Sequence, residues 1–215
     1  MITLQRFIFN PFQQNTYVLY TETKECAIVD PGCYTQAERD ELENFIETNR
    51  LKPTLLLNTH GHVDHVLGNA FIHRKYNLTP MAHRQDLELL QVAEEHGAMY
   101  GFTVEPSPSI EKFIEDGETI KLGNSEILAL HVPGHSLGSL AFVCREEKMV
   151  LTGDVLFAGS IGRTDLLGGN YDQLMNSIRT KLMPLGDEFV VFSGHGPRTS
   201  IGSEALSNPF LQGNI

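Results

Sequence analysis

Four side chains that can bind metal lie within six residues, shortly after the apolar run 55–57. The segment is His60-Gly61-His62-Val63-Asp64-His65, and zinc, iron and manganese accept its imidazoles and carboxylate as donors. Without a cation, these groups would repel one another or lie desolvated and unpaired. A strand end followed by a glycine turn can direct His60 and His62 to one side and Asp64 and His65 to another. The segment therefore predicts ligands for two neighbouring ions; the alternative is a solvated histidine-rich loop without a function.

The composition limits the size of the fold and the class of partner. The chain has 215 residues, of which 41% are hydrophobic, so it can bury one sizeable core, and we expect one domain over residues 1–215. It carries 16 Lys and Arg against 27 Asp and Glu, a formal net charge of −11, without a run rich in Lys or Arg. Because such a surface repels phosphates, no nucleic-acid partner is expected.

The cysteines and the N-terminus indicate the compartment. Cys26, Cys33 and Cys144 are an odd number without Cys-x-x-Cys spacing, which fits a reducing environment. The N-terminal residues do not resemble a signal peptide, and no apolar run approaches membrane-spanning length. We therefore expect a soluble cytoplasmic enzyme with no membrane partner.

The hydrophobic pattern predicts an α/β chain. Strands are expected at 15–20, 26–29, 55–57, 80–82, 119–122, 127–132, 139–144, 149–152 and 189–192. Helices are expected at 35–50, 66–76, 85–95 and 172–183, with an irregular loop at 96–109. An apolar strand flanked by helices in each half predicts two mixed sheets packed together and covered by helices on both outer faces. Ligands at the carboxyl ends of strands from both halves would then meet along one edge.

Three further ligand candidates occur where a predicted strand meets a glycine turn. They are His135 in Pro133-Gly134-His135, Asp154 in Thr152-Gly153-Asp154, and His195 in Ser193-Gly194-His195. Glycine beside each one permits a tight turn and a close approach of the backbone to an ion. Each alone is more typical of a turn residue than of a ligand, but together they complete a set.

In their order along the chain, these motifs resemble those of the metallo-β-lactamase superfamily, with Val29-Asp30-Pro31-Gly32 at its early motif. The resemblance implies the αβ/βα four-layer sandwich and two divalent ions, zinc above all, with iron or manganese as alternatives. By this resemblance, His60, His62 and His135 would hold one ion, and Asp64, His65 and His195 the other. Asp154 and a hydroxide would bridge the two, which makes Asp64 and Asp154 the candidate catalytic residues. Asp30 would support the ligand loop, although on sequence alone it could equally be a plain turn residue.

Within the superfamily, residues 159–165, the stretch 196–199 and Asn208-Pro209-Phe210 are similar to the short hydroxyacylglutathione hydrolase (glyoxalase II) type. By that similarity Arg163 is the candidate substrate-binding residue. Full-length glyoxalase II enzymes add a C-terminal helical domain that holds glutathione, and this chain ends too early to contain it. Asp165 also stands where that family has an aromatic residue. We therefore expect weak recognition of glutathione.

The expected reaction is hydrolysis of a small-molecule acyl-thioester such as S-lactoylglutathione. Two divalent ions sharing a hydroxide can lower the pKa of water from about 15.7 towards roughly 7 and polarise a carbonyl. A thiolate, with a pKa of about 8.5, leaves without strong acid assistance, and the sequence offers no obvious proton donor beyond the ligands. The main alternative is a persulfide dioxygenase with one iron between His60, His135 and Asp154, because that branch also carries a Gly-Arg-Thr-Asp stretch. A phosphodiesterase, a lactonase and a non-catalytic binding module are the remaining alternatives.

Overall fold

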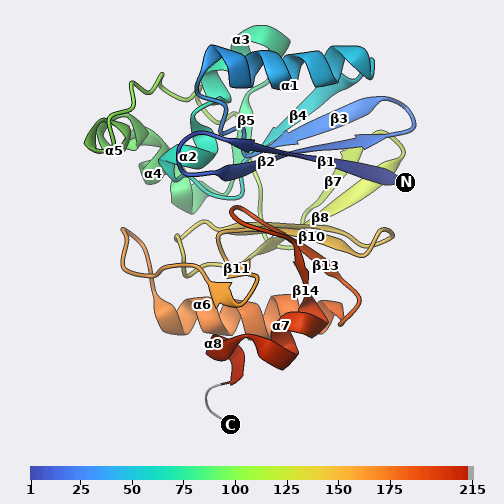
Figure 1. The fold of residues 1–215 in the computed structure, drawn as a ribbon, viewed down its shortest axis with the longest axis vertical. Coiled ribbons are helices and arrows are strands. Elements are labelled where there is room, and N and C mark those ends of the chain that lie inside the picture. Colours follow the sequence, from blue (N-terminus) through green and yellow to red (C-terminus); the bar gives the residue numbers. More distant parts are fainter. Residues whose placement is uncertain (213–215) are drawn as a thin grey trace.

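The structure is a computed structural model that describes residues 1–212. Two six-stranded sheets face each other at the centre of the molecule, and helices cover the outer face of each sheet (Figure 1). This arrangement confirms the predicted four-layer αβ/βα sandwich. Within the described residues, no helix is both long and apolar enough to cross a membrane.

Both sheets are mixed. The first contains, in spatial order, β1 (Ile2–Phe9), β2 (Gln14–Thr21), β3 (Glu25–Val29), β4 (Lys52–Leu57), β5 (Pro80–Ala82) and β6 (Lys112–Phe113). Its first three strands are antiparallel, and β3 to β6 run parallel. The second contains β14 (Thr199–Ser200), β13 (Val190–Ser193), β10 (Met149–Gly153), β9 (Leu140–Cys144), β8 (Ser125–His131) and β7 (Thr119–Leu122). Only β13 and β10 pair in parallel there, among the described strands. A separate hairpin joins β11 (Leu156–Phe157) and β12 (Ser160–Ile161).

The helices lie outside the sheets and beside the loops at one edge. They are α1 (Gln36–Thr48), α2 (Val63–Val66), α3 (Asn69–Tyr76), α4 (Leu87–Gln91), α5 (Ala93–Met99), α6 (Tyr171–Ser177), α7 (Ile201–Ser207) and α8 (Pro209–Gln212). A π-helical turn, Ile178–Leu182, continues α6, and 3₁₀ turns occupy Arg84–Asp86 and Met183–Leu185. Helix α1 begins with a capping box, in which the Thr35 hydroxyl accepts from the Glu38 amide and the Glu38 carboxylate accepts from the Thr35 amide.

Side chains alternate between two apolar layers along the central strands. Leu19 and Phe142 lie in the layer between the sheets. Val18 packs with residues of α1 and α3 on the outer face of the first sheet, and Val143 packs with α6 on the outer face of the second. Because both faces of these strands are buried, the strands appear in the sequence as continuous runs of apolar residues.

The predicted strands are confirmed with shifted ends, but several helix predictions are wrong in detail. The helix expected at 66–76 is two helices that meet at Gly68, whose amide donates to the Pro31 carbonyl. A Cβ at Gly68 would lie 2.6 Å from Cys33 Sγ, so the break allows the ligand loop to pack against the Asp30 turn. The helix expected at 85–95 is a 3₁₀ turn followed by α4 and α5, and α5 takes the first residues of the expected loop 96–109.

Backbone hydrogen bonds join loops from both halves at one edge of the sandwich. The Leu140 amide donates to the Thr59 carbonyl at 2.8 Å. The Gly194 amide donates to the Gly153 carbonyl at 2.8 Å, and the Asn15 amide donates to the Gly194 carbonyl at 2.7 Å. These bonds bring together the ends of β4, β10 and β13, each of which precedes a candidate ligand.

Candidate metal centre

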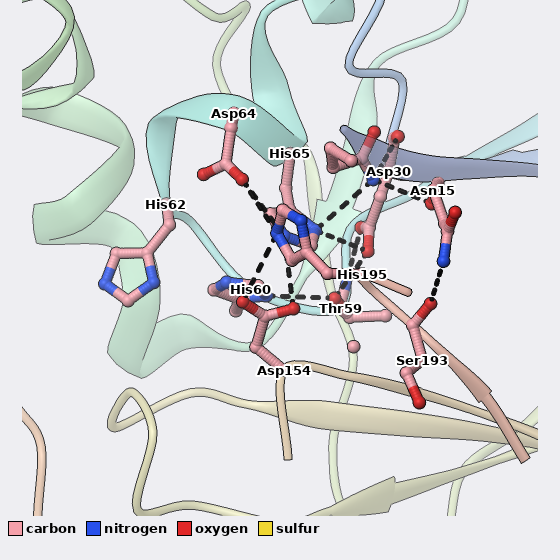
Figure 2. A network of polar contacts seen from close by, with 12 residues as sticks. Asn15, Asp30, Thr59, His60, His62, Asp64, His65, Asp154, Ser193 and His195 are labelled. Atoms are coloured by element: carbon pink, nitrogen blue, oxygen red, sulfur yellow. Dashed lines mark hydrogen bonds and ion pairs between the residues drawn. The ribbon is translucent and has the colours of Figure 1, made fainter. Parts of the chain in front are cut away.

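The structure brings all seven sequence-predicted ligands to this edge. His60 lies on the loop after β4, His62 precedes α2, and Asp64 and His65 lie in α2. The other three lie on the loops that follow β8, β10 and β13, namely His135, Asp154 and His195. Figure 2 shows His60, Asp64, His65, Asp154 and His195 with dashed lines for their polar contacts, and His62 beside them.

One ligand group consists of His60, His62 and His135. One nitrogen of each ring lies within 4.8 Å of the other two. His62 Nδ1 and His135 Nε2 are only 2.9 Å apart, and His60 Nε2 is buried with no hydrogen-bond partner in the described part of the chain. Three converging ring nitrogens are a donor set that suits a divalent transition metal.

A second group consists of Asp64, His65 and His195. Asp64 Oδ2 lies 3.0 Å from His195 Nε2 and 3.6 Å from His65 Nε2. The contact between Asp64 and His65 is not a hydrogen bond. The buried Nε2 of His65 therefore has no hydrogen-bond partner among residues 1–212. A carboxylate and two imidazoles again form a set that fits a divalent ion.

Asp154 lies between the two groups. Its Oδ1 is 3.4 Å from His65 Nε2, and its Oδ2 is 3.6 Å from His195 Nε2 and 3.8 Å from His135 Nε2. Oδ1 is buried and lacks a hydrogen bond to any described residue. Gly194 makes room for this carboxylate, because a Cβ there would lie 2.1 Å from Oδ1. The residues therefore fit two ions that share Asp154.

Contacts on the far side of each ring orient four of the five histidines. His135 Nδ1 donates to the Arg163 carbonyl at 2.9 Å, and His195 Nδ1 donates to the Phe12 carbonyl at 3.1 Å. His65 Nδ1 donates to Asp30 Oδ2 at 3.0 Å, and His60 Nδ1 lies 3.0 Å from Thr59 Oγ1. An outer partner on Nδ1 leaves the Nε2 lone pair free for a metal.

Asp30 orients two of these rings. It is buried, and its oxygens accept hydrogen bonds from the Thr59 amide at 2.7 Å and the Thr59 hydroxyl at 2.6 Å, as well as from His65. Because the Thr59 hydroxyl donates to Asp30, it accepts from His60. Asp30 also lies close enough to His60 and His65 to form a ligand group with them, but its oxygens are already engaged. The contacts thus favour the supporting role over a plain turn.

Sequence reasoning missed Asp86, which links two ligand loops. The side chain is fully buried; Oδ2 accepts from the Gly61 amide at 2.9 Å and the Ser136 hydroxyl at 2.8 Å, and Oδ1 accepts from the Gly138 amide at 2.6 Å. Asn15 was also missed. Its side-chain amide donates hydrogen bonds to the Ser193 and Gly196 carbonyls beside His195, each at 2.9 Å. Neither belongs to a motif, and only the fold brings each to its partner loop.

The two groups differ in their electrostatics. Burial lowers the pKa of His62 to about 3, and burial together with the neighbouring imidazoles lowers the pKa of His60 well below its usual value. Burial favours the neutral form of His65, but the carboxylates of Asp154 and Asp64 outweigh burial and raise the pKa of this histidine. Although burial again opposes it, nearby histidines, His65 first, hold the pKa of Asp154 well below its usual value. An ion entering the second group would therefore displace protons.

A cavity of about 440 Å³ opens in front of the ligands. Besides His62, Asp64, His135, Asp154 and His195, it is lined by Arg163 and by side chains that are largely apolar. His96 and Tyr100 also line it. Both were expected in an irregular loop, but His96 lies in α5 and Tyr100 directly follows that helix.

Comparisons with known proteins agree with this geometry. The model of the metallo-beta-lactamase superfamily matches residues 9–195. The hydroxyacylglutathione hydrolase GloC of Haemophilus influenzae is 39% identical over 207 residues, which cover 93% of each chain. The crystal structure of the BLEG-1 B3 metallo-beta-lactamase superposes with a TM-score of 0.90 at 33% identity, over 98% of this chain and 100% of that one. TTHA1623 in a di-iron-bound form superposes with a TM-score of 0.88 at 34% identity, over 96% of this chain and 100% of that one. Because the family model spans most of the chain and ends at His195, this chain belongs to the metallo-β-lactamase superfamily and is a metal-dependent hydrolase.

Proposed function

We propose that the protein is a dinuclear thioesterase that cleaves small acyl-thioesters to a carboxylic acid and a free thiol. The observation that carries the proposal is the position of Asp154 between two groups of three ligands, beside a cavity large enough for a small molecule. The 39% identity to a hydroxyacylglutathione hydrolase supports the choice of reaction.

The chain's own residues would hold and orient the reacting groups. Bound at the two groups, divalent ions would supply an activated water and polarise the carbonyl. Asp154 carries negative charge to both groups, and Asp64 carries it to the second. The largely apolar cavity wall lowers the local polarity beside the ligands, which strengthens these electrostatic interactions.

A thioester is favoured because its leaving group needs little help. A thiol with a pKa of about 8.5 departs as the thiolate near neutral pH, whereas an amine requires a proton. His96 and Tyr100 are the titratable side chains of the cavity wall outside the ligand groups and Arg163, within the described residues. His96 lies in the middle of α5 and Tyr100 follows the helix, and within residues 1–212 neither side chain has a hydrogen bond to a ligand.

The second ligand group favours a dinuclear hydrolase over a persulfide dioxygenase. A single iron between His60, His135 and Asp154 would leave Asp64, His65 and His195 unused, although one ligand atom of each of these three lies within 4.8 Å of the other two. We propose zinc as the metal; the di-iron form of TTHA1623 supports iron as the alternative. Elemental analysis should give about two metals per chain. One iron per chain with oxygen uptake on a persulfide would contradict the proposal.

The activity test is a substrate panel with metal-loaded and metal-stripped protein. Acyl-thioesters should release free thiol with the loaded protein alone, and faster than an amide, a β-lactam, a lactone or a phosphodiester of similar size reacts. A faster reaction with any of those four classes would replace the thioesterase with that activity.

We also propose that the chain works as one domain in the cytoplasm, on a small molecule and without a nucleic-acid or membrane partner. The net charge of −11 and the buried free thiols of Cys26, Cys33 and Cys144 support this setting.

A further inference from the structure

Apolar side chains from both halves form the outer wall of the cavity. Phe12 precedes β2, Leu89 and Met99 come from α4 and α5, and Leu166 and Leu167 come from the loop that leads into α6. In Figure 1, α5 and this loop lie on the same side of the molecule, α5 in the upper half and the loop in the lower half. The Phe12 and Tyr100 rings pack edge to face with their centroids 5.2 Å apart. Large apolar groups that stay exposed around a cavity suit an apolar ligand.

Arg163 is the single Lys or Arg that lines this cavity, within residues 1–212. Its guanidinium is already engaged, because Nε donates to Asp165 Oδ1 and Nη2 donates to Asp165 Oδ2, both at 2.8 Å. This two-point geometry is the one with which arginine binds a carboxylate ligand. An anionic substrate would have to displace Asp165 or approach Arg163 beside its negative charge.

We propose that this site accepts uncharged, apolar acyl-thioesters, and that Asp165 determines this specificity by occupying Arg163 and keeping anionic thiols such as glutathione from pairing with it. The identity of the reacting group rests on the proposed thioesterase function. The charge selectivity does not, since it concerns binding alone.

The effect should be modest, since both side chains are more than half exposed, at 57% and 70%. Exposed ion pairs are weak, so removing Asp165 should strengthen binding of an anionic ligand about two- to fivefold. Arg163 holds His135 through its backbone carbonyl, so side-chain substitutions at 163 and 165 leave that hydrogen bond available.

The test compares two thioethers that cannot be hydrolysed and that carry the same hexyl chain. One is S-hexylglutathione, which is anionic, and the other is the S-hexyl thioether of N-acetylcysteamine, which is neutral. Calorimetric titration of the metal-loaded protein should give tighter binding of the neutral thioether. In Asp165→Asn, the affinity ratio should shift about two- to fivefold towards the glutathione thioether. In the double variant Arg163→Gln/Asp165→Asn, the ligand can no longer pair with the Arg163 guanidinium. The shift in the affinity ratio should therefore be smaller than in Asp165→Asn alone.

Asp40→Asn is the matched control, because it removes one negative charge from an exposed position on α1, away from the cavity. It should leave the affinity ratio unchanged. Tighter binding of the glutathione thioether by the wild type, or an unchanged ratio in Asp165→Asn, would overturn the proposed selectivity. Failure of the loaded wild type to hydrolyse any thioester would overturn the thioesterase proposal instead, and the binding ratio would still decide the role of Asp165.

Discussion

At the scale of single residues, Asp154 occupies the position on which both ligand groups depend. It lies within 4.0 Å of histidines that belong to each group. We expect Asp154→Ala to disturb both metals and to lower kcat/KM by at least about a hundredfold, because both ions lose a shared anionic ligand. Metal content and kcat/KM of the purified variant measure the effect.

His65→Ala is the comparison for Asp154→Ala. His65 Nε2 faces Asp64 and Asp154, and its Nδ1 is engaged by Asp30, so His65 serves the second ligand group, whereas Asp154 lies between both groups. His65→Ala should mainly weaken the second ion and leave close to one metal per chain. Near-normal metal content and turnover in Asp154→Ala would show that neither metal binding nor catalysis depends on Asp154.

The protonation of individual histidines predicts that the two groups lose metal at different pH. With a pKa of about 3, His62 faces little competition from protons until the solution becomes strongly acidic. Burial opposes a charged His195, but its hydrogen bond to Asp64 and the charge of Asp154 raise its pKa above 6.5, and the pKa of His65 is raised too. Protons therefore compete with a metal at the second group already near neutral pH.

Acidification from about pH 8 to about pH 5 should thus release the ion of the second group first. Metal content after equilibration at each pH should fall from about two towards one per chain before the three-histidine group is emptied. Simultaneous loss of both ions, or retention of the ion at the second group while the first empties, would contradict this order.

At the scale of elements, the strand–glycine–ligand motifs were predictable because each is local in sequence. Gly153-Asp154 and Gly194-His195 each follow an apolar strand, and the structure places each pair at such a strand end. The break between α2 and α3 was not predictable, because it depends on the contact of Gly68 with Pro31 and Cys33, far back in the chain. Strand β1 was also missed, since its exposed and buried residues do not alternate regularly.

Asp86 shows the same limit and leads to a prediction about the loops it joins. Asp86→Ala would leave the buried amides of Gly61 and Gly138 without their acceptor, at a cost of about 1–3 kcal/mol each. We expect a lower free energy of unfolding in the metal-free protein and weaker metal binding by the three-histidine group, whose loops lose their link. Denaturant titration and chelator competition measure these two effects separately.

Ser136→Ala is the control for Asp86→Ala, because it removes one donor to Asp86 and leaves both amides paired. Its effects should be smaller in both measurements. If Asp86→Ala lowered stability but left the affinity of the three-histidine group unchanged, Asp86 would serve the fold alone.

At the scale of the whole molecule, the sandwich and the convergence of ligands from its two halves were predictable, because an apolar strand flanked by helices occurs in each half and the ligand motifs resemble those of one superfamily. The charge and the apolar lining of the cavity could not be predicted from the sequence. The pairing of Arg163 with Asp165 depends on side-chain geometry within a loop, and the joining of Phe12, α5 and the loop before α6 into one wall depends on tertiary packing.

Each ligand group takes residues from both halves, so bound metal should hold the sandwich together. His135 joins His60 and His62 across the two halves, and His195 joins Asp64 and His65. An ion that binds only the folded chain stabilises it by about 2.7 kcal/mol when its free concentration is a hundredfold above its Kd. For a chain of this length, 1 kcal/mol corresponds to about 2–4 °C in Tm, so two ions should raise Tm by roughly 10–20 °C. Scanning calorimetry before and after chelation should show this shift as one transition, because the ions connect both sheets. A fall in Tm confined to one of two separate transitions would instead mean that each half unfolds independently and that the metals do not join them.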